Sequence, residues 1–154
     1  MGVEIERKFL VTKEDWRPLG EPVHYLQGYL VADGKRTVRI RIAGKEGFLT
    51  IKGESSGMSR QEFEYRVPVG EALEMIRLCS TPVVEKYRTK VLYRGKIWEV
   101  DEFEGENKGL ILAEIELTAE DESFAVPPWI GEEVTSELKY YNSRLALHPF
   151  RNWI

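Results

Sequence analysis

Charged side chains recur at every second position in several segments of this 154-residue chain. The first such segment is Val3-Glu4-Ile5-Glu6-Arg7-Lys8-Phe9, in which two glutamates and a lysine alternate with mainly apolar residues. Successive side chains of a β-strand point to opposite faces, and neighbours on one face lie roughly 6.5–7 Å apart. Carboxylates and cations at that spacing can bind divalent metal ions and phosphate groups, because hard cations prefer oxygen ligands and Arg and Lys bind phosphate oxygens. The segment therefore predicts a strand with one charged, chemically capable face.

The same alternation returns in later segments, each carrying charge of mainly one sign. A sheet with one wetted face would also alternate, but that face normally mixes in Ser, Thr, Asn and Gln. Charged pairs at positions i and i+2, segregated by sign, favour a shared enclosed lining instead. The carboxylates in the pattern are Glu4, Glu6, Glu62, Glu64, Glu99, Asp101, Glu114 and Glu116, and the cations are Lys8, Arg39, Arg41, Lys52, Arg66, Lys86, Arg88 and Lys90.

Most of the chain reads as strands joined by hairpin turns, with Asp33-Gly34 and Arg94-Gly95 among the turn signals. Eight strands of similar length in one domain favour a closed barrel, so the expected fold class is mainly β (α+β): an eight-stranded antiparallel β-barrel with a few flanking helices. Ions enclosed in its bore would need partners of both signs, because an unpaired buried ion costs several kcal/mol. The expected strands are residues 2–11, 25–32, 36–43, 47–53, 60–68, 83–93, 96–104 and 109–118.

Three helical segments are expected beside the strands. The first covers residues 70–79, and the second opens at Thr118-Ala119-Glu120-Asp121, which has the form of a capping box. The third is a C-terminal helix over residues 135–147. These helices can cover only part of the apolar outer face of a barrel, so long loops or a second copy of the chain, in a homodimer, are expected to cover the rest.

Composition and charge exclude several classes of protein. The chain is 42% hydrophobic and 31% charged without a biased tract, so a single domain spanning residues 1–154 is expected. A net charge of −4 argues against a nucleic-acid partner. No apolar run is long enough to cross a bilayer, the start lacks the apolar stretch of a signal peptide, and the single cysteine fits a reducing compartment; no membrane partner and a cytoplasmic location are therefore expected.

On these residues the chain resembles the CYTH superfamily, the triphosphate tunnel metalloenzymes. Their signature is an N-terminal Glu-x-Glu-x-Lys strand, here Glu4-Ile5-Glu6-Arg7-Lys8. The resemblance covers nearly the whole chain, and the tail from Pro127-Pro128-Trp129 onwards is similar to that of the short bacterial members. The further matching segments are Gln27-Gly28-Tyr29-Leu30, Arg39-Ile40-Arg41, Thr50-Ile51-Lys52, Arg60-Gln61-Glu62-Phe63-Glu64, Glu85-Lys86-Tyr87-Arg88, Glu99-Val100-Asp101 and Ala113-Glu114-Ile115-Glu116.

The resemblance implies a role for each matching position and implies Mg²⁺ or Mn²⁺ as the cofactor. Glu62 and Glu64 match an acidic pair that orients the attacking water, and Lys139 matches a residue near one mouth of the tunnel. Glu4, Glu6, Lys8, Glu62 and Glu64 form the implied catalytic set. The implied metal ligands are Glu4, Glu6 and Glu116, with Asp101 and Glu114 near a second metal, and the implied triphosphate-binding cations are Lys8, Arg39, Arg41, Lys52, Lys86 and Arg88.

The expected activity is metal-dependent hydrolysis of a linear triphosphate, a small-molecule substrate, by in-line attack of water on a terminal phosphorus. Inorganic tripolyphosphate, cleaved to pyrophosphate and phosphate, is the expected substrate. A nucleoside or thiamine triphosphatase is the near alternative, and an adenylyl cyclase would use the same tunnel with a ribose hydroxyl as nucleophile. A polyphosphate-binding module without turnover is disfavoured because the acidic pairs are intact. A plain β-protein whose charged face is surface is the remaining alternative.

Overall fold

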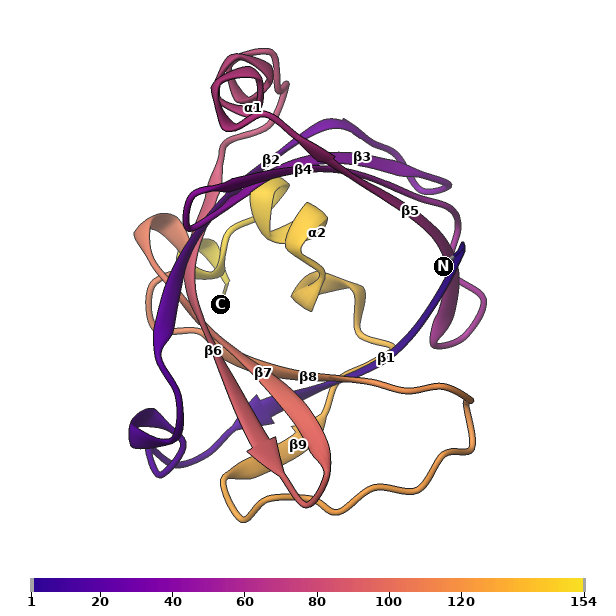
Figure 1. Ribbon diagram of the computed structural model, residues 1–154, viewed down its shortest axis with the longest axis vertical. Helices are drawn as coiled ribbons and strands as arrows, with labels where there is room; N and C mark the ends of the chain where they lie inside the picture. The colour runs from indigo at the N-terminus through magenta and orange to yellow at the C-terminus, as the bar shows by residue number, and fades with distance from the viewer. Residues whose placement is uncertain (1, 154) are drawn as a thin grey trace.

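Nine strands form one antiparallel sheet in the computed structural model, which describes residues 2–153. In the order β5-β4-β3-β2-β6-β7-β8-β1 the sheet closes on itself, because β1 also pairs with β5 (Figure 1). This closed barrel confirms the expected fold class. The strands are β1 Gly2–Val11, β2 Pro22–Ala32, β3 Thr37–Ala43, β4 Glu46–Lys52, β5 Ser59–Val67, β6 Val84–Tyr93, β7 Lys96–Phe103, β8 Ile111–Glu116 and β9 Ile130–Glu133.

Helices are short and lie at the margins of the barrel. The longest, α1 (Val69–Arg77), corresponds to the expected helix over residues 70–79. The helix expected at Thr118 is wrong: residues 118–121 form a bend and a turn, in which the Thr118 backbone N–H and hydroxyl donate to Glu122 at 2.6 and 2.8 Å. The remaining pieces are α2 Asn142–Leu147 and the 3-10 turns η1 Arg17–Leu19, η2 Gly105–Asn107, η3 Leu138–Tyr140 and η4 Phe150–Asn152.

The C-terminal segment differs from the single helix expected over residues 135–147. It first adds β9 beside the end of β1, a strand that the sequence analysis did not anticipate. The backbone N–H of Val134 donates to the carbonyl of Lys8 at 2.8 Å, and the Lys8 N–H donates to the Thr135 hydroxyl at 3.0 Å. Because these bonds tie residues 134–135 to β1, the chain winds into a helix only later, at Asn142.

Two apolar clusters lie on the outer face of the barrel. In one, Trp98 packs edge-on against Phe9, Phe124 and Trp129, with ring centroids 5.5–6.1 Å apart. The segment between β8 and β9 supplies Phe124 and Trp129 and thereby covers β1, β7 and β8. In the other cluster, α1 packs on β2, β3 and β4 (Figure 1). The core of this protein therefore lies largely outside the ring of strands.

A third apolar cluster fills one end of the bore. Val84, Phe103 and Leu112 share the inward face of their strands with the charged lining, and they contact Leu145 and Ala146 of α2. Figure 1 shows α2 within the outline of the barrel. The C-terminal segment thus closes one end of the bore with apolar side chains and leaves the charged part beyond it.

Part of the outer face stays uncovered. Ile51, Phe63 and Tyr65, on β4 and β5, are 39%, 41% and 56% exposed. The expected cover by a second copy of the chain remains a prediction. Among residues 2–153, no helix has both the length and the hydropathy that crossing a membrane requires.

The inner apolar cluster, in which Leu145 and Ala146 of α2 plug one end of the bore, leads to a prediction for the stability of one variant. Leu145 is fully buried in the inner cluster, so Leu145→Ala is expected to lower the free energy of unfolding by about 2–5 kcal/mol. Leu147, on the same helix but 56% exposed, is the matched control, and Leu147→Ala should change it by less than about 0.5 kcal/mol. Urea unfolding measures both values. Equal effects of the two changes would mean that α2 does not dock as described.

Candidate active site

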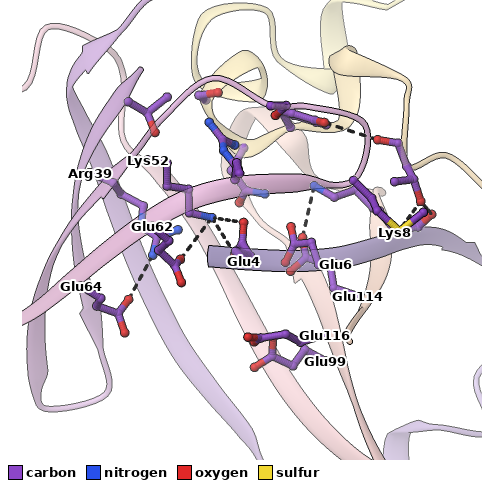
Figure 2. A pocket seen from close by; sticks show the side chains of 18 of the residues that line it. Glu4, Glu6, Lys8, Arg39, Lys52, Glu62, Glu64, Glu99, Glu114 and Glu116 are labelled. Carbon is purple, nitrogen blue, oxygen red and sulfur yellow. Dashed lines mark hydrogen bonds and ion pairs between the residues drawn. The ribbon is translucent and has the colours of Figure 1, made fainter. Parts of the chain in front are cut away.

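The charged part of the bore is a cavity of ≈ 200 Å³ (Figure 2). Thirteen of the sixteen charged positions of the alternating pattern line this cavity, which eight strands and α2 enclose. The lining comprises Glu4, Glu6, Lys8, Tyr29, Thr37, Arg39, Arg41, Lys52, Ser55, Gly57, Met58, Arg60, Glu62, Glu64, Lys86, Arg88, Glu99, Glu114, Glu116, Thr135, Tyr141, Asn142 and Ser143.

The expected site residues are a second set of fourteen, which includes Lys139 and leaves out Glu99. Twelve of them line the cavity, and the two outside it are Asp101 and Lys139. Of the alternating pattern itself, Asp101, Arg66 and Lys90 are outside the lining, and Arg66 and Lys90 are exposed side chains that pair with Glu46 and Glu99. Lys139 lies at η3, where its ammonium stands 4.6 Å from the Trp153 ring centroid and 5.3 Å from that of Tyr140. The structure therefore brings the expected site residues together around one cavity, except for Asp101 and Lys139.

Carboxylates crowd one wall of the cavity, formed by β1, β7 and β8. Strand register places Glu6 opposite Glu116, and Glu114 opposite Glu99. Figure 2 shows the side chains of Glu6 and Glu114 close to each other, and those of Glu99 and Glu116 likewise. Like charges directly opposite each other on neighbouring strands are destabilising. This wall therefore needs positive charge from elsewhere, either from side chains across the bore or from a bound cation.

Lysines from other strands neutralise part of this wall. Lys52, on β4, lies 3.0 Å from a Glu4 oxygen and 3.6 Å from a Glu62 oxygen (Figure 2). Lys8 lies 3.2 Å from Glu114. Although burial opposes its charge, the cations around Glu114, Lys8 first among them, hold the pKa of this carboxyl below its ordinary value. Glu4, Glu62 and Glu114 are therefore already paired with lysines.

Asp101 lies behind the lining and is buried between two cations. Its oxygens accept from Lys86 at 2.7 Å and from Arg88 at 2.7 and 2.8 Å. Burial disfavours the charge, but Arg88 and Lys86 hold the pKa of Asp101 below its ordinary value. The carboxylate thus anchors two cations of the neighbouring strand β6.

Arginines on β3 keep donors free. Arg41 donates through Nε to Gln27 at 2.9 Å and forms no ion pair with any carboxylate in residues 2–153. Burial, followed by the nearby Arg39 and Arg88, lowers the pKa of Arg41 to about 10. The buried Nε of Arg39 has no hydrogen-bond partner among the described residues. Guanidinium N–H groups without a partner in an enclosed site fit an anionic ligand such as phosphate.

Among the acidic side chains of the cavity, Glu6 and Glu116 are the ones without a positively charged partner in residues 2–153. Neither forms an ion pair within the described part of the chain. Burial, with Glu114 and Glu4 nearby, raises the pKa of Glu6 to about 8. Burial and the charges of Glu4 and Glu99 also raise the pKa of Glu116.

This set of oxygen donors fits a hard divalent cation. Within residues 2–153 no three acidic, His or Cys side chains already surround one point, because Glu4 is held by Lys52 and Glu114 by Lys8. Metal binding would therefore require Lys52 to release Glu4. A phosphate oxygen in the bore offers that lysine another partner.

Sequence reasoning missed several lining residues. Arg60 precedes Glu62 by two positions on β5, so the alternation could have identified it. The uncharged Tyr29, Tyr141 and Asn142 carried no comparable signal, although they lay in segments that match the family. Asn142 reaches the cavity only through the fold of the C-terminal segment.

The raised pKa of Glu6 predicts an unusual dependence of stability on pH. Between its ordinary pKa of 4.5 and about 8, the folded state binds more protons than the unfolded state, so the free energy of unfolding falls as pH rises. The Glu6→Gln variant lacks this titration. In metal-free buffer it should exceed the wild type by at least ~1 kcal/mol near pH 9 and lose this advantage near pH 4.5. Urea unfolding across this range measures the difference, and an advantage independent of pH would contradict the assignment.

Comparisons with known proteins agree with this geometry. The chain is 49% identical over 154 residues to an inorganic triphosphatase of Acetivibrio thermocellus, covering 99% of each protein. It is 41% identical over 150 residues to an inorganic triphosphatase of Nitrosomonas europaea, covering 94% of this chain and 97% of that protein. A solved structure of an inorganic triphosphatase aligns at 39% identity, with a TM-score of 0.66 and 96% of each chain covered. The CYTH domain description matches residues 2–146, and the chain belongs to the CYTH domain family.

Proposed function

We propose that this chain hydrolyses inorganic tripolyphosphate to pyrophosphate and phosphate with the help of a divalent metal ion. The observation that carries the proposal is a cavity with charges of both signs. In it the guanidinium of Arg41, which has no ion pair within residues 2–153, and the unbonded Nε of Arg39 share one lining with the carboxyl groups of Glu6 and Glu116, which also lack ion pairs there. The two relatives named as inorganic triphosphatases, at 49% and 41% identity, support the same reaction.

Cations of the bore bind the phosphate groups in this proposal. Arg39 and Arg41 supply free N–H donors, which suit the paired oxygens of a phosphate. Lys8, Lys52, Lys86 and Arg88 bind as further charges on the same lining. Because they approach from several strands, these cations hold a linear triphosphate in one orientation and neutralise charge that shifts during phosphoryl transfer.

Glu4, Glu6 and Glu116 would hold the metal, with Glu114 beside them. When bound, Mg²⁺ or Mn²⁺ supplies a Lewis acid that polarises phosphate oxygens and activates water. Asp101 has both oxygens occupied by Lys86 and Arg88, so we assign it to positioning these cations. Lys139, which stacks on Trp153, receives no role in the site.

Glu62 is the proposed acceptor for the proton of the attacking water. Burial and the nearby Glu4 raise the pKa of Glu62, which makes its carboxylate a better base than an ordinary glutamate. Glu64 accepts from Thr50 at 3.0 Å and lies 3.5 Å from Arg39, so it orients Arg39. Water attacks the terminal phosphorus in line, and pyrophosphate leaves.

An inorganic substrate fits the cavity better than a nucleotide. Its volume of ≈ 200 Å³ is below the roughly 300–1,000 Å³ typical of pockets for drug-sized ligands. The aromatic side chains of the lining are Tyr29 and Tyr141, and the apolar plug with Leu145 fills the bore beyond them. A base therefore has no stacking niche within the described lining.

Location and assembly complete the proposal. A cytoplasmic location accords with the single cysteine, Cys79, which is a free thiol. No nucleic-acid partner is proposed, because many of the cations face the bore. A homodimer through the exposed Ile51, Phe63 and Tyr65 would cover the outer face of β4 and β5.

Product identity tests the reaction. Purified protein is offered tripolyphosphate, ATP, GTP and thiamine triphosphate with Mg²⁺ or Mn²⁺, and phosphate, pyrophosphate and cyclic AMP are measured. Release of phosphate with the highest kcat/KM for tripolyphosphate is expected. Cyclic AMP with pyrophosphate from ATP would indicate an adenylyl cyclase, and binding of tripolyphosphate without release of phosphate would indicate a binding module.

Removing a metal-binding carboxylate predicts loss of turnover with retention of fold. Glu6→Gln keeps the shape of the side chain but removes its charge, so kcat with Mg²⁺ should fall by at least about 100-fold. Arg7→Gln is the matched control, because Arg7 lies on the opposite face of β1 and pairs with Glu133 outside the bore. Circular dichroism should show the same fold for both. Similar losses of activity in the two variants would argue against the metal role.

Removing an unpaired arginine predicts weaker binding of substrate. Arg41→Ala should raise the KM for tripolyphosphate by on the order of tenfold to hundredfold, because a hydrogen bond to a charged group contributes about 1.5–3 kcal/mol. Arg36→Ala is the control, since Arg36 is an exposed residue that pairs with Asp33 in a turn. Steady-state kinetics measures both, and an unchanged KM for Arg41→Ala would exclude phosphate binding by this residue.

A further inference from the structure

Two neutral amides connect the plug of the bore to its cations. Asn142, the first residue of α2, accepts through Oδ1 from Lys86 at 2.9 Å and from the Gln27 amide at 3.2 Å. Gln27, on β2, is fully buried and accepts through Oε1 from Arg41 at 2.9 Å. Its amide nitrogen also donates to the Tyr29 hydroxyl at 3.1 Å. Nothing in the proposed chemistry uses these two amides directly.

We propose that Asn142 and Gln27 are positioning residues that aim Lys86 and Arg41 at the phosphate groups of the substrate. This inference rests on the proposed function and identifies what orients two of its binding cations. Both amides act through the cations that they contact.

The donors of Lys86 show how the positioning operates. An ammonium group has three N–H donors. Asp101 accepts one at 2.7 Å and Asn142 accepts another at 2.9 Å, so both oxygens together fix the direction of the third. Lys86 lines the cavity, and the third donor is the one available to a phosphate oxygen.

Arg41 is fixed in a similar manner. Gln27 accepts from its Nε, which leaves the two terminal nitrogens of the guanidinium for a ligand. The Gln27 amide cannot rotate freely, because its nitrogen is held by Tyr29 and Asn142. Gln27 and Asn142 therefore form one connected unit.

Neutral acceptors suit this task better than carboxylates. A carboxylate in place of Gln27 would cancel the charge of Arg41, and one in place of Asn142 would add a second negative charge beside Lys86, which already pairs with Asp101; either would repel phosphate. An amide oxygen fixes the direction of an N–H group and leaves the positive charge to the substrate. Leu145 and Ala146 anchor the helix that carries Asn142, so the apolar plug holds one end of the unit in place.

The test compares Asn142→Leu with Asn152→Leu as matched control. Leucine is close to asparagine in size but accepts no hydrogen bond, and Asn152 is exposed on η4. Asn142→Leu should raise the KM for tripolyphosphate on the order of tenfold, with a smaller change in kcat, because the lost interaction serves binding throughout the reaction. A merely structural role would lower the melting temperature and the active fraction, and hence kcat, without changing KM. That pattern would overturn the proposal.

A double-mutant cycle tests the connection between the amides. Gln27→Met removes the amide with little change in side-chain length, and the double variant should raise KM by less than the product of the two single effects. Multiplicative effects would contradict a single unit.

Stabilisation by tripolyphosphate separates this inference from the proposed function. The rise in melting temperature that tripolyphosphate causes depends on affinity and requires no turnover. If the wild type binds tripolyphosphate without cleaving it, the proposed function fails, while a smaller rise for Asn142→Leu than for Asn152→Leu still supports positioning. Equal rises in the two variants would overturn it.

Discussion

Ionised side chains inside the barrel must keep partners of opposite charge, because each unpaired buried ion costs several kcal/mol. Asp101 meets this condition most completely, with two cations on its oxygens. Lys52 meets it by lying between Glu4 and Glu62. Glu6 does not meet it, and its carboxyl responds by holding a proton up to about pH 8. The distribution of charge over the strands, rather than any single ion pair, makes the bore compatible with folding.

Because charged side chains line the bore, most apolar side chains pack on the outer face of the barrel or at one end of the bore. The outward face of β1, β7 and β8 becomes apolar, and the long segment that carries Phe124 and Trp129 covers it. At the end of the bore the lining changes from charged to apolar, which allows α2 to enter with Leu145. The same segment that completes the core thus brings Asn142 to the cations. Under the proposed function, substrate binding as well as stability depends on the docking of one short helix.

Alternation in the sequence predicted the strands well, because a period of two is imposed by the backbone of every strand. The same rule placed Glu6 and Arg41 in one cavity without knowledge of their contacts. The alternation could not show that Asp101 lies outside the lining. It indicates to which face of a strand a side chain points, but not how far along the barrel axis the side chain lies. It also gave no signal for β9 or for Asn142, whose places depend on how the C-terminal segment packs on β1 and in the bore.

The ion pairs that stabilise the charged lining of the bore also compete with ligands for the same side chains. A phosphate that takes Lys52 leaves Glu4 without its cation, and a metal ion that takes Glu4 leaves Lys52 without its acid. Each ligand alone therefore breaks a pair and exposes a charge, whereas both together give every side chain a new partner. Under the proposed function, metal and triphosphate should strengthen each other's binding, by the same factor in both directions. Arg41 pairs with no carboxylate among the described residues, so a phosphate group can bind to it without breaking an ion pair.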